Sequence, residues 1–233
     1  ERRQLVLFHE MLNRLERHGS TATVFATGLN AERQPEISRE ILARGHTLGN
    51  HSLSHSPFLM LNGSRTLRQE LQGAQRIFRE LGVVPLAFRP PVGITSPRLW
   101  LPLLESGMFC VNFSCRAFDR GNRSIARLAA KILGRVRPGD IILLHDIAPK
   151  GSDTDDLLKE FEAVLLGLKQ NGFAIVPLGQ LIGKEVTQRD ASSHEPGPAE
   201  AFYDGLAVDY DHEQLCSNVS ISRRTEYDLF MAR

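Results

Sequence analysis

Cysteine is scarce in this 233-residue chain, which contains only Cys110, Cys115 and Cys216. So sparse and odd a set predicts neither a disulfide framework nor a Cys-x-x-Cys metal motif, and small buried thiols are the simplest interpretation. Excess charge is also lacking, because the formal net charge is +1. Clusters of Lys and Arg interleaved with aromatic residues are absent from the sequence, so the electrostatic signature of a nucleic-acid-binding protein is missing. We therefore expect no nucleic-acid partner.

Long apolar runs are missing as well. No stretch approaches the roughly 20 residues that a membrane-spanning helix needs, so we expect no membrane span. The first residue is Glu1 rather than Met. We therefore expect the native N-terminus to be missing, which makes the lack of a signal peptide uninformative. The hydrophobic share of 42% and charged share of 24% are ordinary for a globular protein. The length suits one domain, or one domain and part of another.

Residues 1–183 alternate between amphipathic and short apolar segments. The spacing of apolar residues predicts helices near 5–18, 35–44, 67–81, 125–136 and 157–168. Short runs that are apolar or rich in β-branched residues predict strands within 21–28, 46–50, 85–93, 108–114, 141–146 and 174–179. Such repeated alternation predicts a parallel α/β sheet or barrel, whose functional residues gather at the carboxyl ends of the strands.

Two histidines follow one of these strand ends. His51 and His55 lie in the segment "GNHSLSHSP", whose Gly, Asn, Ser and Pro residues favour a loop over a helix. Two nearby imidazoles suit zinc, whose catalytic sites usually have three protein ligands and an open water position. Taken alone, such a pair is more often incidental, and its polar neighbours could simply form turns.

Three further polar residues fall at strand ends. Arg89 precedes two prolines that hold it extended, where it could orient a carboxylate or form only a surface ion pair. His145 ends an apolar strand and suits a general acid, although a hydrogen-bonded core histidine is equally consistent. Asp119 could pair with His145 or cap the helix that follows.

Four segments taken together carry a family resemblance. "ATVFATG", "GHTLGNHSLSH", "FRPPVG" and "GDIILLHD", in this order and spacing, resemble the NodB-homology polysaccharide deacetylases of carbohydrate esterase family 4. The resemblance spans about residues 1–183. It implies a distorted (β/α) barrel that removes acetyl groups from sugars such as N-acetylglucosamine, using a divalent metal that is usually zinc. It also suggests the cell envelope or an extracytoplasmic location.

The resemblance assigns roles to individual residues. His51 and His55 resemble the two metal-binding histidines, and Arg89 resembles the arginine that holds the base carboxylate. His145 resembles the general acid that protonates the leaving amine, and Asp119 lies near the carboxylate that tunes this histidine.

Three more residues resemble parts of the substrate pocket. Pro91 and Val92 match the substrate-binding turn, where the backbone N–H of the position held by Val92 helps to hold the oxyanion. Leu143 resembles the leucine that lines the acetyl pocket.

The sequence departs from the family pattern at three places. No Asp-Asp pair, which supplies the base and the third metal ligand in the family, precedes residues 21–28. We expect the first strand to be missing by truncation, the chain to be inactive by itself and the longer native protein to be active. Val92 stands where tyrosine is frequent, and Arg120 where tryptophan is common. The last difference leaves the substrate preference open.

The helix-strand pattern stops near residue 184. Residues 184–200 are polar and contain Pro-Gly-Pro, which predicts a linker. Residues 201–233 are expected to start a second domain or to form a C-terminal extension. The segment "FYDGLAVDYD" within them weakly resembles the opening of class I methyltransferases.

Two other functions remain compatible with the residues. One is a catalytically dead barrel that binds carbohydrate, which the absent Asp pair favours. The other is a metal-dependent amidohydrolase that acts on a non-sugar amide. The order of the four segments favours the glycan deacetylase over both.

Overall fold

A computed structural model describes residues 2–117, 125–148, 151–190 and the backbone of 218–224. Asp119, Arg120 and most of residues 191–233 lie outside the described residues. The predicted boundaries of the linker and of a second domain therefore stay predictions.

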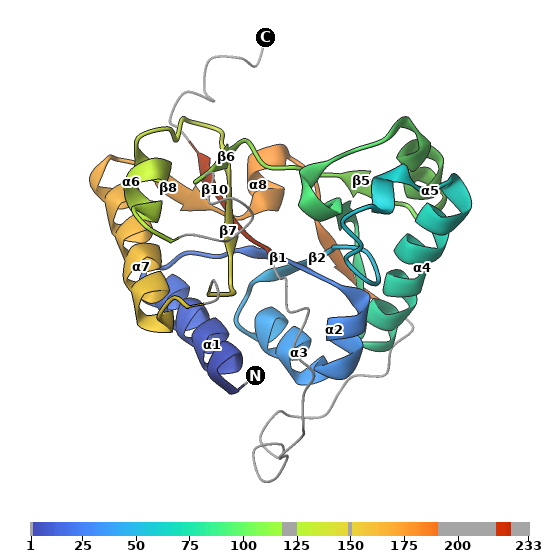
Figure 1. Cartoon of the computed structure of the whole chain (residues 1–233), viewed down its shortest axis with the longest axis horizontal. Helices are drawn as coiled ribbons and strands as arrows, with labels where there is room; N and C mark the ends of the chain where they lie inside the picture. Colours follow the sequence, from blue (N-terminus) through green and yellow to red (C-terminus); the bar gives the residue numbers. More distant parts are fainter. Residues whose placement is uncertain (1, 118–124, 149–150, 191–217, 225–233) are drawn as a thin grey trace.

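Short strands form the centre of the molecule (Figure 1). The strand order in the main sheet is β5-β4-β2-β1-β10-β7-β6, and β8 pairs with β10. β1 is parallel to β2, β2 to β4, β4 to β5, and β6 to β7. The strands are β1 (Thr23–Ala26), β2 (Thr47–Asn50), β4 (Ala87–Phe88), β5 (Phe109–Cys110), β6 (Cys115–Arg116), β7 (Ile141–His145), β8 (Ala174–Val176) and β10 (Asn218–Arg224).

The two edges of this sheet lie close together. β5 and β6 stand at opposite ends of the strand order, yet only residues 111–114 separate them in the chain. The five residue steps from the end of β5 to the start of β6 can span at most about 18 Å, so the sheet curves until its edges approach one another. This curvature is that of a distorted (β/α) barrel, and the predicted fold class is confirmed. A separate antiparallel pair consists of β3 (Val83–Pro85) and β9 (Thr187–Arg189).

The sheet contains an antiparallel strand between β1 and β7. β10 pairs with both of them, with Ser220 opposite Thr23 on one side and Leu143 on the other. The peptide groups of β1 and β7 that face this position are thereby hydrogen-bonded to β10, as buried backbone requires. No described strand precedes α1 in the chain.

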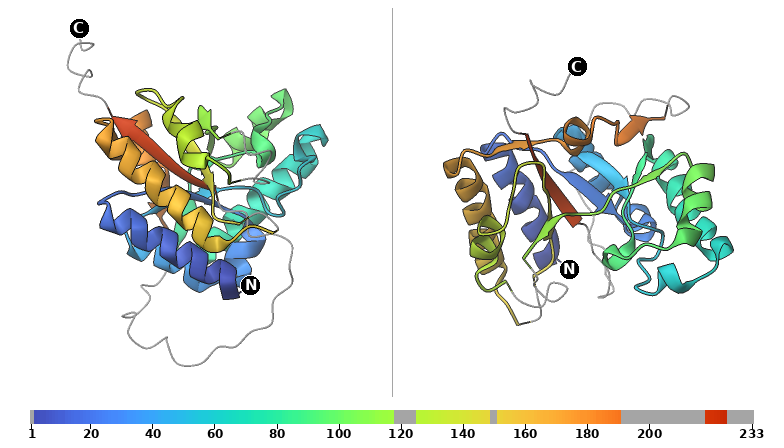
Figure 2. Two further views of the ribbon diagram at one scale, coloured as in Figure 1. Left: turned by 60° about the vertical axis from the view of Figure 1, so that its left-hand side comes forward. Right: turned by 90° about the horizontal axis from the view of Figure 1, so that it is seen from above.

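Most of the helices form a row in which each packs against the next. α6, α7 and α1 adjoin one another, as do α3, α2, α4 and α5, and the α1–α3 contact includes an ion pair between His9 Nε2 and Glu40 Oε2 at 3.2 Å. Figure 2 shows α1 and α7 side by side. The helices are α1 (Arg2–Arg17), α2 (Gly28–Arg33), α3 (Pro35–Ala43), α4 (Ser64–Glu80), α5 (Trp100–Glu105), α6 (Leu128–Leu133), α7 (Thr154–Gln170), α8 (Leu178–Ile182) and the 3-10 turns η1 (Leu59–Leu61), η2 (Pro91–Gly93) and η3 (Pro97–Leu99). In the part of the chain that the structure describes, none of these helices is both long and apolar enough to cross a membrane.

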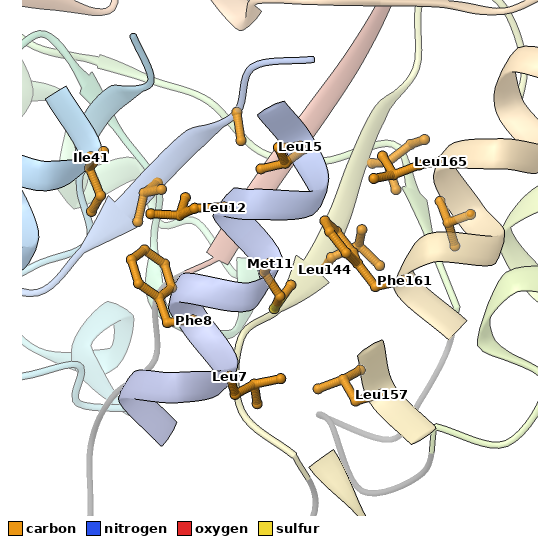
Figure 3. Packing of buried hydrophobic residues seen from close by; sticks show 14 of the residues in the cluster. Leu7, Phe8, Met11, Leu12, Leu15, Ile41, Leu144, Leu157, Phe161 and Leu165 are labelled. Atoms are coloured by element: carbon orange, nitrogen blue, oxygen red, sulfur yellow. The ribbon is translucent and has the colours of Figure 1, made fainter. Parts of the chain in front are cut away.

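The largest core cluster lies between the helices and the sheet. The apolar stripe of α1 divides between two neighbours, as Figure 3 shows: Leu7 and Met11 lie toward α7, and Phe8 and Leu12 lie toward Ile41 of α3. Each fully buried Leu or Phe side chain contributes about 1.5–3 kcal/mol. This packing fixes α1 and α7 on the sheet and so positions the ends of β1 and β7.

Several predicted elements differ from those observed. Of the strand predicted over 108–114 only β5 is observed, and a separate strand, β6, begins one residue beyond it, with Cys115 opposite Ile142 of β7. Gly28, interpreted as the end of a strand, begins α2 because the Thr27 hydroxyl accepts a hydrogen bond from the Asn30 N–H at 3.3 Å and caps the helix. The helix predicted over 125–136 is shortened to α6 by Arg127, whose φ of 57° is left-handed.

Gly49 of β2 is required by its neighbour in β1. A Cβ at this position would lie 2.4 Å from ring carbons of Phe25. We predict that Gly49→Ala lowers the free energy of unfolding by about 1–3 kcal/mol, because Phe25 must shift within a packed core. Urea unfolding measures this loss. Gly63→Ala is the matched control, since nothing lies within 4 Å of its Cβ position. Equal stability of the two variants would contradict the prediction.

Candidate active site

Three parallel strands, β1, β2 and β4, end at one edge of the sheet and bring candidate residues together. Ala26, Asn50 and Phe88 are in register, at the ends of β1, β2 and β4. Two backbone hydrogen bonds continue this register beyond the strands: His51 N–H donates to Ala26 at 3.0 Å, and Arg89 N–H donates to Asn50 at 2.9 Å. The predicted gathering of these residues at the carboxyl edge is confirmed for His51 and Arg89.

The loop that carries both histidines is shaped by polar side chains. Asn50 Oδ1 accepts from Ser52 N–H at 2.9 Å, and Ser52 Oγ accepts from His55 N–H at 3.0 Å. Ser52 and His55 have positive φ angles of 70° and 59°, a conformation that is uncommon outside glycine. The side-chain hydrogen bonds hold the backbone in this conformation, and the expected loop, rather than a helix, is observed.

Glu70 of α4 anchors the same loop and was not predicted from the sequence. One carboxylate oxygen accepts from the N–H groups of Leu53 and Ser54 at 3.0 and 2.9 Å, and the other accepts from Ser54 Oγ at 2.8 Å. Its only sequence signal is a carboxylate next to Leu71, on the apolar side of an amphipathic helix. The loop is thereby tied to a rigid helix.

The two imidazoles lie against each other. Their ring centroids are 4.7 Å apart, with an angle of 66° between the ring planes. Burial lowers the pKa of His51 well below its usual range, and the neighbouring His55 lowers it further. Burial also lowers the pKa of His55, followed by the charge of His145. Both rings are therefore neutral at pH 7, which is the form that binds metal ions.

The hydrogen bonding of His51 suits a metal ligand. Its Nδ1 lies 2.7 Å from the carbonyl oxygen of Arg89, so Nδ1 carries the proton and donates it to this bond. The lone pair of the neutral ring is then on Nε2, an arrangement typical of metal-binding histidines. Across residues 2–117, 125–148 and 151–190, no group of three His, Cys, Asp or Glu side chains could hold a metal ion. Among the described residues, His51 and His55 therefore fit two of the ligands of a metal ion.

Arg89 is a buried cation without a described counter-ion. Its side chain is only 1% exposed, and burial lowers its pKa to about 9, so it stays charged at neutral pH. The guanidinium lies 4.0 Å above the ring of Phe25 and donates to the carbonyls of Val111 and Asn112 at 3.3 and 3.4 Å. Its Nη1 has no hydrogen-bond partner among the described residues. A buried cation of this kind calls for a carboxylate.

The turn after Arg89 projects from the sheet edge. Pro91 is buried, whereas Val92 is half exposed and has a left-handed φ of 53°. His145 is partly buried at the end of β7, and Leu143 is buried two residues earlier on the same strand. Side chains two apart on a strand share a face, so Leu143 lies on the side of β7 that bears His145. The roles predicted for these residues and for Asp119 stay predictions.

The structure brings a defined subset of the candidates together. His51, Arg89 and the turn at Val92 are linked by the backbone of residues 89–92 and by the hydrogen bond at Arg89. His55 contacts His51, and the charge of His145 acts on His55. Sequence reasoning missed Glu70, Phe25 and Asn112, whose contacts come from distant segments.

Comparison with known proteins is consistent with this arrangement. A sequence profile of the polysaccharide deacetylase family matches residues 6–110. A chitooligosaccharide deacetylase of Sinorhizobium fredii is 31% identical over 182 residues, which cover 73% of this chain and 83% of that protein. A peptidoglycan-N-acetylglucosamine deacetylase of Bacillus cereus is 26% identical over 175 residues, covering 74% and 80%. The structure of a family 4 acetyl xylan esterase from Clostridium thermocellum, in complex with a cobalt ion, has a TM-score of 0.65 and 29% identity, covering 76% and 84%.

Proposed function

Because this chain belongs to the polysaccharide deacetylase family, we propose that it hydrolyses acetyl amides on N-acetylated sugars with the aid of a divalent metal, zinc. The relatives named as chitooligosaccharide and peptidoglycan-N-acetylglucosamine deacetylases support this substrate class. The observation that carries the proposal is the pair of neutral imidazoles, with centroids 4.7 Å apart and one ring oriented by the Arg89 carbonyl. A metal ion bound in the esterase from Clostridium thermocellum supports the metal requirement.

Each residue of the site has a proposed task. His51 and His55 hold the metal through ring nitrogens. A bound zinc ion supplies polarisation of the acetyl carbonyl and a water of lowered pKa. The backbone N–H of Val92 donates to the oxygen of the acetyl carbonyl as it gains negative charge. His145 donates a proton to the departing sugar nitrogen. Leu143 lines the space for the acetyl methyl group.

The general base and third ligand are proposed to be carboxylates outside the described residues. Two observations support this proposal: the described residues offer only two imidazoles to a metal, and the buried Arg89 guanidinium has an unpaired nitrogen among them. The family resemblance implies an Asp pair on a strand upstream of the first helix. We therefore propose that the 233-residue chain needs upstream residues for activity. The family resemblance also supports a location at the cell envelope or outside the cell.

Acetate release tests the proposal directly. We predict zinc-dependent release of acetate from N-acetylglucosamine oligomers by the chain carrying its natural upstream residues, and little release by the 233-residue chain. His145→Ala is expected to lower kcat about 100- to 10,000-fold, because positioned proton transfer contributes that much. His18→Ala, a change just beyond the C-terminus of α1, where His18 contacts Glu162 of α7, is the matched control and should retain full activity.

The same assay separates the alternatives. Binding of the oligomers without acetate release by either form would replace the enzyme with a carbohydrate-binding barrel, which the missing third ligand favours. Release of acid from a non-sugar amide, with no action on the sugars, would replace the substrate class.

A further inference from the structure

The turn at residues 90–93 has a backbone that its own sequence disfavours. Val92 and Gly93 are consecutive left-handed residues, with φ angles of 53° and 72°. This conformation suits glycine, but a β-branched residue such as valine rarely adopts it. The Val92 side chain is half exposed, so burial of that side chain does not hold the turn. Within the turn, the Gly93 N–H donates to the Pro90 carbonyl at 3.1 Å.

Asn112, in the segment that follows β5, forms a hydrogen bond to this turn. Its Nδ2 donates to the Gly93 carbonyl at 2.7 Å, and its Oδ1 accepts from the Phe113 N–H at 3.1 Å. Both ends of the amide are therefore engaged, which fixes the side chain. The Phe113 ring lies against the same glycine, since a Cβ on Gly93 would be 2.9 Å from two ring carbons.

Asn112 is connected to the histidine pair through Arg89. The carbonyl of Asn112 accepts from Arg89 Nη2 at 3.4 Å, and the carbonyl of Arg89 accepts from His51 Nδ1 at 2.7 Å. Asn112 itself is tied to the sheet by its neighbour Val111, whose N–H donates to Phe88 at 2.8 Å. A chain of contacts thus runs from the metal-binding loop through Arg89 and Asn112 to the Val92–Gly93 turn.

We infer that Asn112 is a positioning residue that holds the Val92–Gly93 turn left-handed and so aims the Val92 N–H at the acetyl oxygen. This inference rests on the proposed function. Surrounding contacts must determine a strained backbone for it to persist, and Asn112 supplies the shortest hydrogen bond to this turn. The hydrogen bond from Asn112 Nδ2 to the Gly93 carbonyl is the contact that holds the turn.

Asn112→Asp removes this hydrogen bond alone. The variant keeps the acceptor for the Phe113 N–H but replaces the donor to Gly93 with an oxygen. Removal of an oxyanion donor costs about 100- to 1,000-fold in kcat, and a displaced donor costs less. In the acetate assay we expect kcat to fall about 10- to 100-fold with KM nearly unchanged, because the contact acts in the transition state.

Rescue at the turn distinguishes positioning from a general structural role. Asparagine adopts the left-handed conformation readily, so Val92→Asn should recover most of the kcat lost by Asn112→Asp. Val92→Ile, which stays β-branched, should recover none. Ser114→Ala is the control from the same segment, because its hydroxyl binds Asp140 instead of the turn; it should keep kcat unchanged. Failure of Val92→Asn to recover kcat, or a loss confined to KM or to thermal stability, would overturn the inference.

A second measurement needs no turnover and separates this inference from the proposed function. In the 233-residue chain, Asn112→Asp should shift the amide NMR signals of Val92 and of Ile94, whose N–H shares a peptide group with the Gly93 carbonyl. Signals in α7 should stay in place if the fold is intact. Unchanged Val92 and Ile94 signals would refute the claim that Asn112 holds the turn. Shifted signals, together with no acetate release by the chain that carries its natural upstream residues, would refute the deacetylase and leave the contact between Asn112 and the turn established.

Discussion

Replacing His51 with alanine is expected to abolish zinc binding and to lower acetate release at least about 1,000-fold. Metal polarisation is worth several kcal/mol in the transition state, and each 1.36 kcal/mol changes the rate tenfold. Zinc content after gel filtration and acetate release under saturating zinc measure the two effects separately. Since His51 is buried and bonded to Arg89, His55→Ala serves as a second variant that leaves this bond in place.

The control for both variants is another histidine. His9 lies on α1 and contacts Glu40, so His9→Gln should keep the zinc stoichiometry and the rate of the parent protein. Retention of zinc and activity by both His51→Ala and His55→Ala would remove the imidazole pair from the metal site.

Arg89→Met is expected to separate activity from stability. Acetate release by the lengthened chain should fall at least about 100-fold, because the buried guanidinium no longer orients the base carboxylate. The free energy of unfolding of the 233-residue chain should change by less than about 1 kcal/mol or should increase. An uncompensated buried charge is costly, and an apolar side chain of similar length removes that cost.

Urea unfolding of the 233-residue chain measures the second effect. Arg68→Met provides the comparison, since Arg68 is paired with Glu105 at the surface and its loss should cost at most about 1 kcal/mol. A destabilisation above about 2 kcal/mol in Arg89→Met would show that the described contacts already compensate the buried charge.

Much of this architecture was predictable from local patterns. The alternation of strands and helices predicts the parallel strands β1, β2, β4 and β7. The rule that functional residues follow strand ends then groups His51 with Arg89. These inferences succeed because residues at strand ends need only the strand register to become neighbours.

The residues that sequence reasoning missed depend on distant partners. Glu70 reaches Ser54 from 16 residues away, and Asn112 reaches Gly93 from 19 residues away. Neither separation carries a periodic signal, because the contacts arise only after the helix and strand ends have packed. β10 was missed for another reason: five of its seven residues are polar (Asn218, Ser220, Ser222, Arg223 and Arg224), which is unusual for a strand between buried neighbours.

The place of β10 sets the order in which the sheet can form. β1 and β2 lie near each other in the chain and can pair early, whereas β1 meets β10 across almost 200 residues. Strand pairing over such a long range slows folding, because the entropy of loop closure is lost before the stabilising contacts form. During synthesis, the backbone groups of β1 and β7 that pair with β10 therefore stay unpaired until residues 218–224 emerge from the ribosome. Other strands can bind to these edges in the meantime. Aggregation of nascent chains should concentrate in this interval.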